Sequence, residues 1–161
     1  MSLMNKLSSE TQIFLDKARK KKKKIVFTNG CFDIMHVGHL AYLNEARAQG
    51  DLLIVGLNSD GSVKRLKGDD RPINCESDRK VFLLNLRSVD CVEIFDQDTP
   101  LELIKLLRPD VLVKGGDWKI GQIVGGDLVQ SYGGSVKSLS FLDGYSTTNL
   151  INDIQKKIRS I

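Results

Sequence analysis

Two histidines stand three residues apart in this sequence, and they are the only two that it contains. They lie in His36-Val37-Gly38-His39, shortly after the apolar run Ile25–Thr28, which we interpret as a buried strand. A helix that opens here would bring both imidazoles to one face, because residues i and i+3 are neighbours on a helix. Its free backbone N–H groups and its macrodipole would favour an anion. The spacing therefore predicts a site that binds a phosphate group and stabilises charge developing on it.

Two other interpretations of the histidine pair stay open. The pair could be a chance feature of the surface, although both histidines of the chain then follow one strand by accident. It could also chelate a metal, but zinc needs three or four ligands and Asp33 is the only nearby candidate. We therefore expect no metal held by the protein itself.

The residues between the strand and the histidines have expected roles of their own. Gly30 is expected to permit a tight turn, and Gly38 to leave room for close approach of a phosphate to the backbone. Thr28 and Asn29 are expected to line the pocket, although Asn29 could equally satisfy a turn. Asp33 is expected to orient a histidine or to help place magnesium, against the alternative of a turn aspartate.

Five apolar segments alternate with helical patterns along the chain. Residues 25–28, 52–57, 91–95, 111–113 and 135–139 are the expected strands. Helices are expected over residues 8–22, 37–49, 76–86, 100–107, 121–132 and 146–158. This alternation predicts an α/β fold, a Rossmann-like doubly wound five-stranded parallel sheet with helices on both faces. Ligands of such sheets bind beyond the carboxyl ends of the strands, at the switch point.

Length and composition set further limits. The 161 residues predict a single domain over 1–161, with residues 1–23 as an N-terminal helix and basic extension. Three cysteines without CxxC spacing indicate a reducing compartment, and no apolar stretch is long enough for a signal peptide or a membrane span. Residues 19–24 are six consecutive cations, and without them the net charge of +4 becomes 4 − 6 = −2. Such a run is usually a solvated helix end, and contact with nucleic acid or acidic lipid is the alternative.

Motifs at the strand ends carry a family resemblance. Gly30-Cys31-Phe32-Asp33 followed by His36-Val37-Gly38-His39 resembles the GxFD-x-x-HxGH signature of the nucleotidyltransferase superfamily. The match continues through Asn58-Ser59-Asp60, Val63–Gly68, Arg71-Pro72, Arg79, Lys114–Trp118 and Gly144–Thr148. In this superfamily the HxGH histidines grip the phosphates of a nucleoside triphosphate.

The resemblance also implies a set of site residues. It implies that His36, His39 and Lys67 are catalytic. It implies that the nucleotide is bound by Thr28, Asn29, Gly30, Phe32, Asp33, Gly38, Asp60, Arg65, Lys114, Gly116, Asp117, Tyr145, Ser146, Thr147 and Thr148. For Trp118, the single tryptophan, a place in the core is a serious alternative. Asp98 and Thr99 follow the third strand and are not ranked above a helix cap.

Within the superfamily, the motifs resemble the adenylyltransferase of ADP-heptose synthesis in its stand-alone form, without the sugar kinase. The resemblance implies transfer of AMP from ATP to D-glycero-β-D-manno-heptose 1-phosphate, with Mg²⁺ as cofactor, in the cytoplasm. A homodimer is a candidate assembly, and neither nucleic acid nor membrane insertion is expected. A cytidylyltransferase for glycerol 3-phosphate is the alternative, although Phe141 stands where that branch has an arginine. A nucleotide-binding module without turnover is the second alternative.

The polar segment 58–74 is expected to be a long, mobile loop. Long connections of this kind are usually functional or disordered. We expect it to close over the phosphates and to bring Lys67 to the reacting centre.

Overall fold

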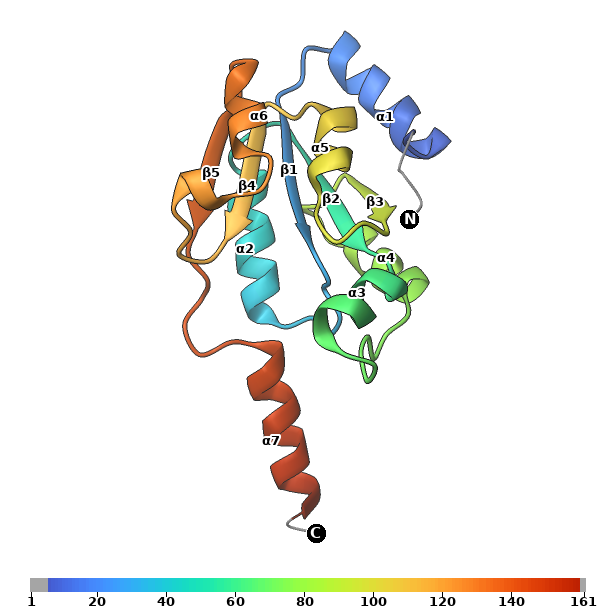
Figure 1. Ribbon diagram of the computed structural model, residues 1–161, viewed down its shortest axis with the longest axis vertical. Helices are drawn as coiled ribbons and strands as arrows, with labels where there is room; N and C mark the ends of the chain where they lie inside the picture. Colours follow the sequence, from blue (N-terminus) through green and yellow to red (C-terminus); the bar gives the residue numbers. More distant parts are fainter. Residues whose placement is uncertain (1–5, 160–161) are drawn as a thin grey trace.

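Five apolar segments pair as parallel strands in the computed structural model, which describes residues 6–159. They are β1 (Ile25–Gly30), β2 (Leu52–Asn58), β3 (Cys91–Phe95), β4 (Val111–Gly115) and β5 (Ser135–Leu139). The order across the sheet is β3-β2-β1-β4-β5 (Figure 1). Central β1 pairs with β2 through Phe27 and Ile54 and with β4 through Phe27 and Leu112. The chain builds outward from β1 through β2 to β3 and then returns to β4, so the switch point lies between β1 and β4.

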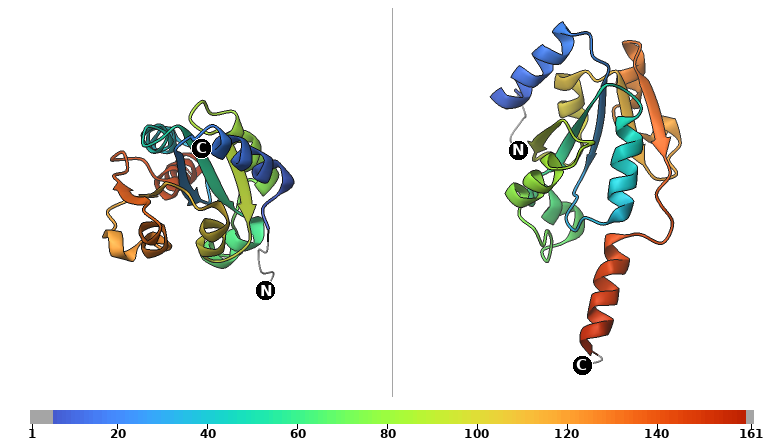
Figure 2. Two further views of the ribbon diagram at one scale, coloured as in Figure 1. Left: turned by 90° about the horizontal axis from the view of Figure 1, so that it is seen from above. Right: turned by 180° about the vertical axis from the view of Figure 1, so that it is seen from behind.

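Helices cover both faces of this sheet, as the sequence predicts. One face carries α1 (Ser9–Lys20), α5 (Leu101–Leu107) and α6 (Gly126–Ser131), and the other carries α2 (Val37–Arg47) and α4 (Glu76–Leu84) (Figure 2). Successive strand residues point to opposite faces, so Phe27 joins the first core cluster and Val26 the second. The predicted doubly wound α/β fold is confirmed.

Helix α1 is anchored on the edge strand β3 by a buried carboxylate. Ser8 caps the helix by accepting the backbone N–H of Thr11 at 3.2 Å. Glu93 of β3 accepts hydrogen bonds from the backbone and hydroxyl of Ser8 and from the hydroxyl of Thr11, at 2.9, 2.6 and 2.5 Å. Leu15 and Ala18 pack into the core, so the helix is part of the folded body. Residues 1–5 of the expected N-terminal extension and residues 160–161 lie outside the described residues.

The segment after β2 differs from the expected loop. Asp60–Lys67 forms a helix, α3, capped by the Ser59 hydroxyl, which accepts the backbone N–H of Ser62 at 3.0 Å. An acid in its first turn and cations in its last turn suit the helix macrodipole. Only Ser62 and Val63 of this helix are buried, so the sequence carries almost no apolar periodicity that would have revealed it.

The expected helix over 121–132 is interrupted. A short 3-10 turn, η1, covers Ile120–Gln122, and α6 starts only at Gly126. Between them Gly125 has a φ of +82°, and a Cβ there would lie 2.6 Å from the Ile104 side chain. Gly125 and Gly126 therefore mark the break between η1 and α6, which packing of Gly125 against Ile104 of α5 requires.

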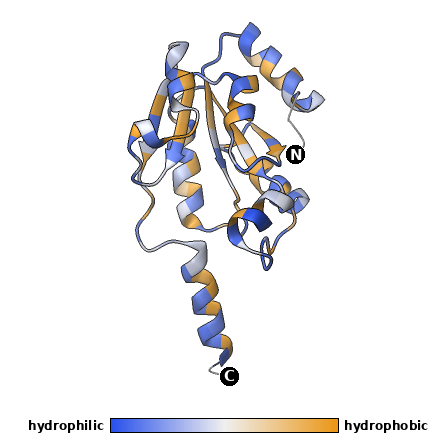
Figure 3. Cartoon of the chain, viewed as in Figure 1, coloured by the Kyte–Doolittle hydropathy of each residue, from blue (hydrophilic) through white to orange (hydrophobic). Residues whose placement is uncertain are grey.

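The last helix, α7 (Thr147–Arg159), projects away from the sheet beyond its carboxyl end (Figures 1 and 2). None of its residues is buried. Hydrophobic and hydrophilic residues alternate along it (Figure 3). Among residues 6–159 no helix has both the length and the apolar character that a membrane span requires.

Candidate active site

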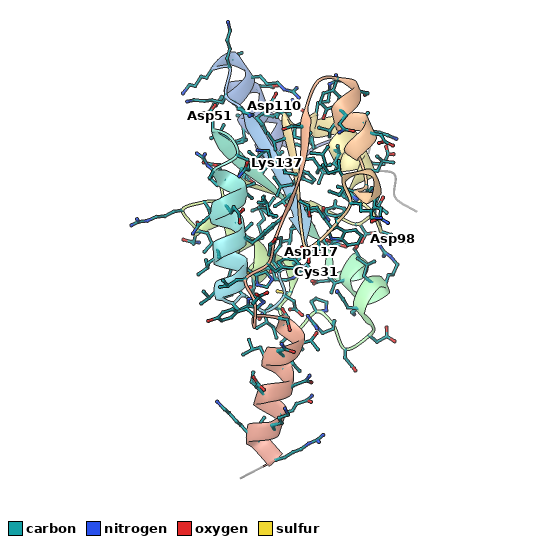
Figure 4. The ribbon with its side chains drawn as sticks, turned by 90° about the vertical axis from the view of Figure 1, so that its left-hand side faces the viewer. Cys31, Asp51, Asp98, Asp110, Asp117 and Lys137 are labelled. Carbon is teal, nitrogen blue, oxygen red and sulfur yellow. The ribbon has the colours of Figure 1, made fainter. Side chains whose placement is uncertain are left out.

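A cavity of about 700 Å³ opens at the carboxyl ends of β1 and β4, which is the switch point of the sheet. Nine of the predicted site residues line it, namely Asn29, Gly30, Phe32, Asp33, His39, Lys67, Lys114, Thr147 and Thr148. Figure 4 shows Cys31, Asp98 and Asp117 at this end of the molecule, where α7 leaves the body. The sequence motifs at separate strand ends therefore meet around one hollow.

The other predicted site residues lie outside the lining of this cavity. They are Thr28, His36, Gly38, Asp60, Arg65, Gly116, Asp117, Tyr145 and Ser146. Thr28 is fully buried and its hydroxyl lies 2.6 Å from the Tyr42 hydroxyl. It therefore packs beneath the cavity, contrary to the expectation that it lines the pocket. Arg65 donates to Asp98 at 2.8 Å, and the Ser146 hydroxyl accepts the backbone N–H of Asn149 at the start of α7.

The two histidines occupy the first turn of α2, as their spacing predicts. His36 is the residue that caps the helix and His39 is the third residue within it. Their rings stack with centroids 3.9 Å apart and an angle of 29° between the planes. The buried Nδ1 of His36 has no hydrogen-bond partner among the described residues. The His36 side chain faces the backbone N–H of His39 in the first turn of α2, and this helix N-terminus favours an anion.

The hydrogen bond between the histidines sets the orientation of the second ring. The backbone N–H of His36 donates to Nδ1 of His39 at 3.3 Å. Burial, and then the neighbouring His36, lower the pKa of His39 to about 4, and burial lowers the pKa of His36 as well. Both rings are therefore neutral near pH 7. Because Nδ1 of His39 accepts a hydrogen bond, its single proton is on Nε2, where it can be donated to a ligand.

Between β1 and α2 the left-handed backbone conformation of the turn occurs at Phe32 and not at Gly30. Gly30 ends β1 in register with Leu57, whereas Phe32 has the left-handed φ of +46°. A Cβ on Gly30 would lie 2.9 Å from the Phe32 ring, so this glycine is required by packing. The expectation of a tight turn at Gly30 is corrected accordingly. A Cβ on Gly38 would lie 2.9 Å from the His36 ring, so this glycine makes room for the histidine.

Asp33 holds the segment after α3 against the cavity. Its carboxylate accepts the Arg71 guanidinium at 2.6 Å and the backbone N–H groups of Ile73 and Asn74 at 2.9 and 2.8 Å. Burial raises the pKa of this carboxyl, but the N–H groups of Asn74 and Ile73 and the charge of Arg71 outweigh burial, so the pKa lies below its usual range. The carboxylate contacts neither histidine.

Two lysines supply positive charge to the cavity. Lys67 comes from the last turn of α3 and Lys114 from the end of β4. Burial lowers the pKa of Lys114, and the nearby Lys67 lowers it further. Burial also raises the pKa of the Cys31 thiol, which keeps it neutral despite the nearby charges of Lys67, Arg79 and Arg71. The cavity thus combines two ammonium groups with the imidazole of His39, on which His36 stacks, and suits an anionic ligand.

Comparison with known proteins gives the family. Residues 27–152 match the family described as cytidylyltransferase-like. The chain belongs to this family. It is 56% identical over 140 residues to the bifunctional protein HldE of Syntrophotalea carbinolica, a match that covers 87% of this chain and 29% of that protein. It is 53% identical over 152 residues to the bifunctional protein HldE of Helicobacter hepaticus, covering 94% of this chain and 31% of that protein. The chain thus spans less than a third of the length of these curated relatives.

Two solved structures are similar as well. The lipopolysaccharide core biosynthesis protein of Thermoplasma volcanium matches with a TM-score of 0.60 and 28% identity, covering 77% of this chain and 99% of that one. The pantothenate synthetase of Thermus thermophilus matches with a TM-score of 0.52 and 16% identity, covering 80% and 60%. The second likeness concerns the fold alone. The predicted membership in the nucleotidyltransferase superfamily is confirmed.

An aromatic wall closes one side of the cavity in this member of the cytidylyltransferase-like family. Trp118 lines the cavity with 47% of its surface exposed, and its Nε1 donates to the Gly115 carbonyl at 3.0 Å. The alternative of a core tryptophan is therefore wrong. Phe141 lies across from it, and a Cβ on Gly115 would lie 2.6 Å from the Phe141 ring. Gly116 has a φ of +105°, so packing and backbone conformation already require both glycines.

Arg79 is a residue that the site prediction leaves out. Its side chain is 1% exposed and donates to the carbonyls of Asn74, Cys31 and Asn58 at 2.9, 2.7 and 2.8 Å. It also donates to the carboxylate of Asp60 at 2.7 Å. Asp60 therefore pairs with a buried arginine and lies outside the cavity lining. Arg79 binds together the ends of β1 and β2, α3 and the loop before α4. The family motif includes it, but no periodicity in the sequence distinguishes it from a surface charge.

The side chains around the cavity offer few ligands for a metal ion such as Mg²⁺. Across residues 6–159 no three His, Cys, Asp or Glu side chains come together as a metal site. Asp33, the one buried acid in the cavity lining, has its oxygens engaged by Arg71 and by two backbone N–H groups. These residues do not fit a magnesium ion held by the protein alone.

Proposed function

We propose that this chain transfers AMP from ATP to D-glycero-β-D-manno-heptose 1-phosphate, giving ADP-heptose and pyrophosphate for lipopolysaccharide core or surface polysaccharide synthesis. The observation that carries the proposal is the stacked His36–His39 pair at the N-terminus of α2, of which His39 lines the same cavity as Lys67 and Lys114. The similarity to a lipopolysaccharide core biosynthesis protein supports a role in that process, and the resemblance of the motifs to the adenylyltransferase of ADP-heptose synthesis supports the choice of sugar phosphate.

In the proposed reaction an oxygen of the sugar phosphate attacks the α-phosphorus of ATP. The bond between the α-phosphorus and its bridging oxygen to the β-phosphorus breaks, and pyrophosphate leaves. The attacking phosphate is already ionised near pH 7, so the protein need not supply a general base. Catalysis then consists of holding the two substrates in line and stabilising charge on the phosphoryl oxygens.

The residues of the cavity suit these tasks. The Nε2–H of His39 is free to donate to a phosphoryl oxygen, and Nδ1 of His36 has no other partner. Negative phosphates raise the pKa of adjacent imidazoles, so binding of ATP would draw protons onto both rings. Lys67 and Lys114 act as point charges. Thr147 and Thr148 add hydroxyl groups at the start of α7, where backbone N–H groups also favour an anion.

Magnesium enters the proposal as part of the substrate, MgATP. Mg²⁺ is commonly bound through substrate phosphates with few protein carboxylates, which agrees with the donor set of the cavity. The cytoplasm is the compartment in which we propose that the reaction occurs. A homodimer remains a prediction of the resemblance.

A cytidylyltransferase that acts on glycerol 3-phosphate is the second candidate, because it would use the same histidines. The side chain at position 141 argues against it, since Phe141 brings an apolar ring to the cavity where that branch carries a cation. A binding module without turnover is the third candidate. It would use the same histidine and cavity lysines to bind the nucleotide, so only turnover distinguishes it from the two enzymes.

A substrate panel with pyrophosphate release as the readout separates the three candidates. The proposal expects release with MgATP and the heptose 1-phosphate, and little release with CTP and glycerol 3-phosphate. Release with the second pair only would support the cytidylyltransferase. Nucleotide binding without release from any pair would support the binding module.

A further inference from the structure

A second hollow lies at the opposite end of the sheet from the candidate active site. It has a volume of about 370 Å³ and is lined by Arg19, Lys22, Lys23, Lys24, Arg108 and Asp110. It also touches Ile25, the first residue of β1, whereas the larger cavity begins at the other end of the same strand. The two hollows are therefore separated by roughly 13 Å of β1, from Ile25 to Asn29 at about 3.3 Å per residue. Figure 4 shows Asp51 and Asp110 at this end, far from Cys31 and Asp98.

The positive charge of the chain is concentrated around this hollow. The net charge is +4, and removing the six cations of residues 19–24 leaves −2. The helix macrodipole accounts for cations within the last turn of α1, which are Lys17, Arg19 and Lys20. It does not account for Lys22, Lys23 and Lys24, which follow the end of the helix.

The acidic groups nearby offset only part of this charge, because Asp110 is the single acid among the lining residues of the hollow, against five cations. Asp110 accepts the backbone N–H of Ile25 at 2.7 Å, and Asp51 accepts the backbone N–H of Lys24 at 2.7 Å. Asp51 lies 4.0 Å from Lys23, which is a weak, exposed pair. Among residues 6–159, Lys22 and Lys24 have no carboxylate partner. Their charge is available to a ligand.

Two cations of the hollow stand at positions with left-handed backbone conformation. Lys22 and Arg108 have left-handed φ values of +51° and +44°. This conformation is unfavourable for residues with a Cβ, and glycine would adopt it without strain. At both positions the chain carries a cation instead. The Arg19 guanidinium donates to the Leu107 carbonyl at 2.7 Å, which joins the end of α1 to the end of α5 across the hollow.

We propose that this hollow binds a small anion with two or more phosphoryl groups. Lysine ammonium groups attract phosphate as point charges, and Arg108 can donate two parallel hydrogen bonds to it. The volume is suited to a compound between pyrophosphate and a nucleotide in size. The site is distinct from the cavity proposed for nucleotidyl transfer, so it stands whether or not that function is correct.

Inorganic tripolyphosphate is a suitable probe, with amide NMR shifts of the full chain as the readout. We expect the amides of residues 22–25 and 108–110 to shift in a saturable manner at about 0.15 M salt. Shifts near His36 would report the other cavity separately. Absence of saturable shifts at residues 22–25 and 108–110 would overturn the proposal, and this wild-type result does not depend on any variant.

Two triple variants test whether tripolyphosphate binds in the hollow or is attracted only by the net positive charge of the segment. The triple variant Lys22→Gln, Lys23→Gln, Lys24→Gln should weaken binding at residues 108–110 about tenfold or more. The control Lys17→Gln, Lys20→Gln, Lys21→Gln removes the same charge outside the lining and should change it less than about twofold. Equal weakening by both would contradict a built site. Shifts caused by phosphatidylglycerol vesicles or by single-stranded RNA, but not by tripolyphosphate, would overturn the assignment to a small ligand.

Discussion

The stacked imidazoles of His36 and His39 are the residues that most directly connect this sequence to chemistry. Gly38 gives the His36 ring its space, and the backbone N–H of His36 fixes the His39 tautomer. Four adjacent residues thus set the geometry of the pair, and the Tyr145 ring packs on His36 from just before α7 with centroids 6.3 Å apart. This local origin explains why the sequence alone was sufficient to predict it.

Removing either imidazole should impair turnover far more than nucleotide binding. His36→Ala and His39→Ala should each lower kcat by about 10²–10³, because the donors matter most when charge develops on the phosphoryl oxygens. The measurements are steady-state pyrophosphate release and the Kd for ATP. A variant that keeps near wild-type kcat under saturating substrates would remove that histidine from the mechanism.

The pH dependence of stability should report His39. Its folded pKa is about 4, and the ordinary value is 6.5. The unfolded state binds the proton more readily between these values, so the stabilisation is complete above pH 6.5 and is lost as the pH falls toward 4. For a fully buried ring this difference in pKa would correspond to about 3.4 kcal/mol; because His39 is partly exposed, the free energy of unfolding should fall by about 2 kcal/mol from this source. Denaturant titrations at several pH values should show a shallower fall for His39→Gln. Parallel curves for the two proteins would contradict the buried, neutral imidazole.

At the scale of elements, α3 replaces the mobile loop that the polar composition suggested. Arg65 reaches Asp98 after β3, and Asp60 reaches Arg79 in α4. These contacts give Lys67 a fixed starting position at the cavity. Whether α3 moves toward bound phosphates stays a prediction.

Lys64 provides a matched control for Lys67 on the same helix. Both lysines are exposed, but only Lys67 lines the cavity. Lys67→Ala should lower kcat by about 10–10² while Lys64→Ala leaves it nearly unchanged. Neither change should shift the midpoint of thermal unfolding appreciably, since exposed lysines contribute little to stability. Equal kinetic effects of the two substitutions would show that Lys67 acts only through general charge.

The stability of the fold should depend strongly on Arg79, whose hydrogen bonds connect several elements. Arg79→Met leaves three carbonyls and the Asp60 carboxylate without their donor and should lower the free energy of unfolding by about 3–5 kcal/mol. Urea denaturation measures the loss, and Arg87→Met, at an exposed position after α4, is the control. A loss below about 1 kcal/mol would contradict the claim that the hydrogen bonds of Arg79 stabilise the fold.

At the scale of the whole molecule, the sheet was predictable because its signals are regular. Apolar runs alternate with amphipathic helices, and right-handed crossovers leave one common topology. The same topology brings the motifs after β1 and β4 to one cavity.

The unpredicted parts depend on contacts between distant residues. The rings of Trp118 and Phe141 both pack against the backbone at Gly116. The buried Arg79 donates hydrogen bonds to carbonyls from three segments. Neither arrangement has a local periodicity. Thr28 belongs to a central strand whose first four residues are all buried, because helices cover both faces of the sheet, although its position beside the motif suggested the pocket.

The fate of labelled phosphates tests the central claim most directly. ATP labelled either at the α- or at the γ-phosphorus is incubated with Mg²⁺, the heptose 1-phosphate and the full chain, and the products are separated by chromatography. Adenylyl transfer at the His36–His39 cavity predicts that the α-label enters a nucleotide sugar and the γ-label enters pyrophosphate, and that His39→Ala slows both together. Transfer of the γ-label to the sugar, or no nucleotide sugar with either label, would contradict the account.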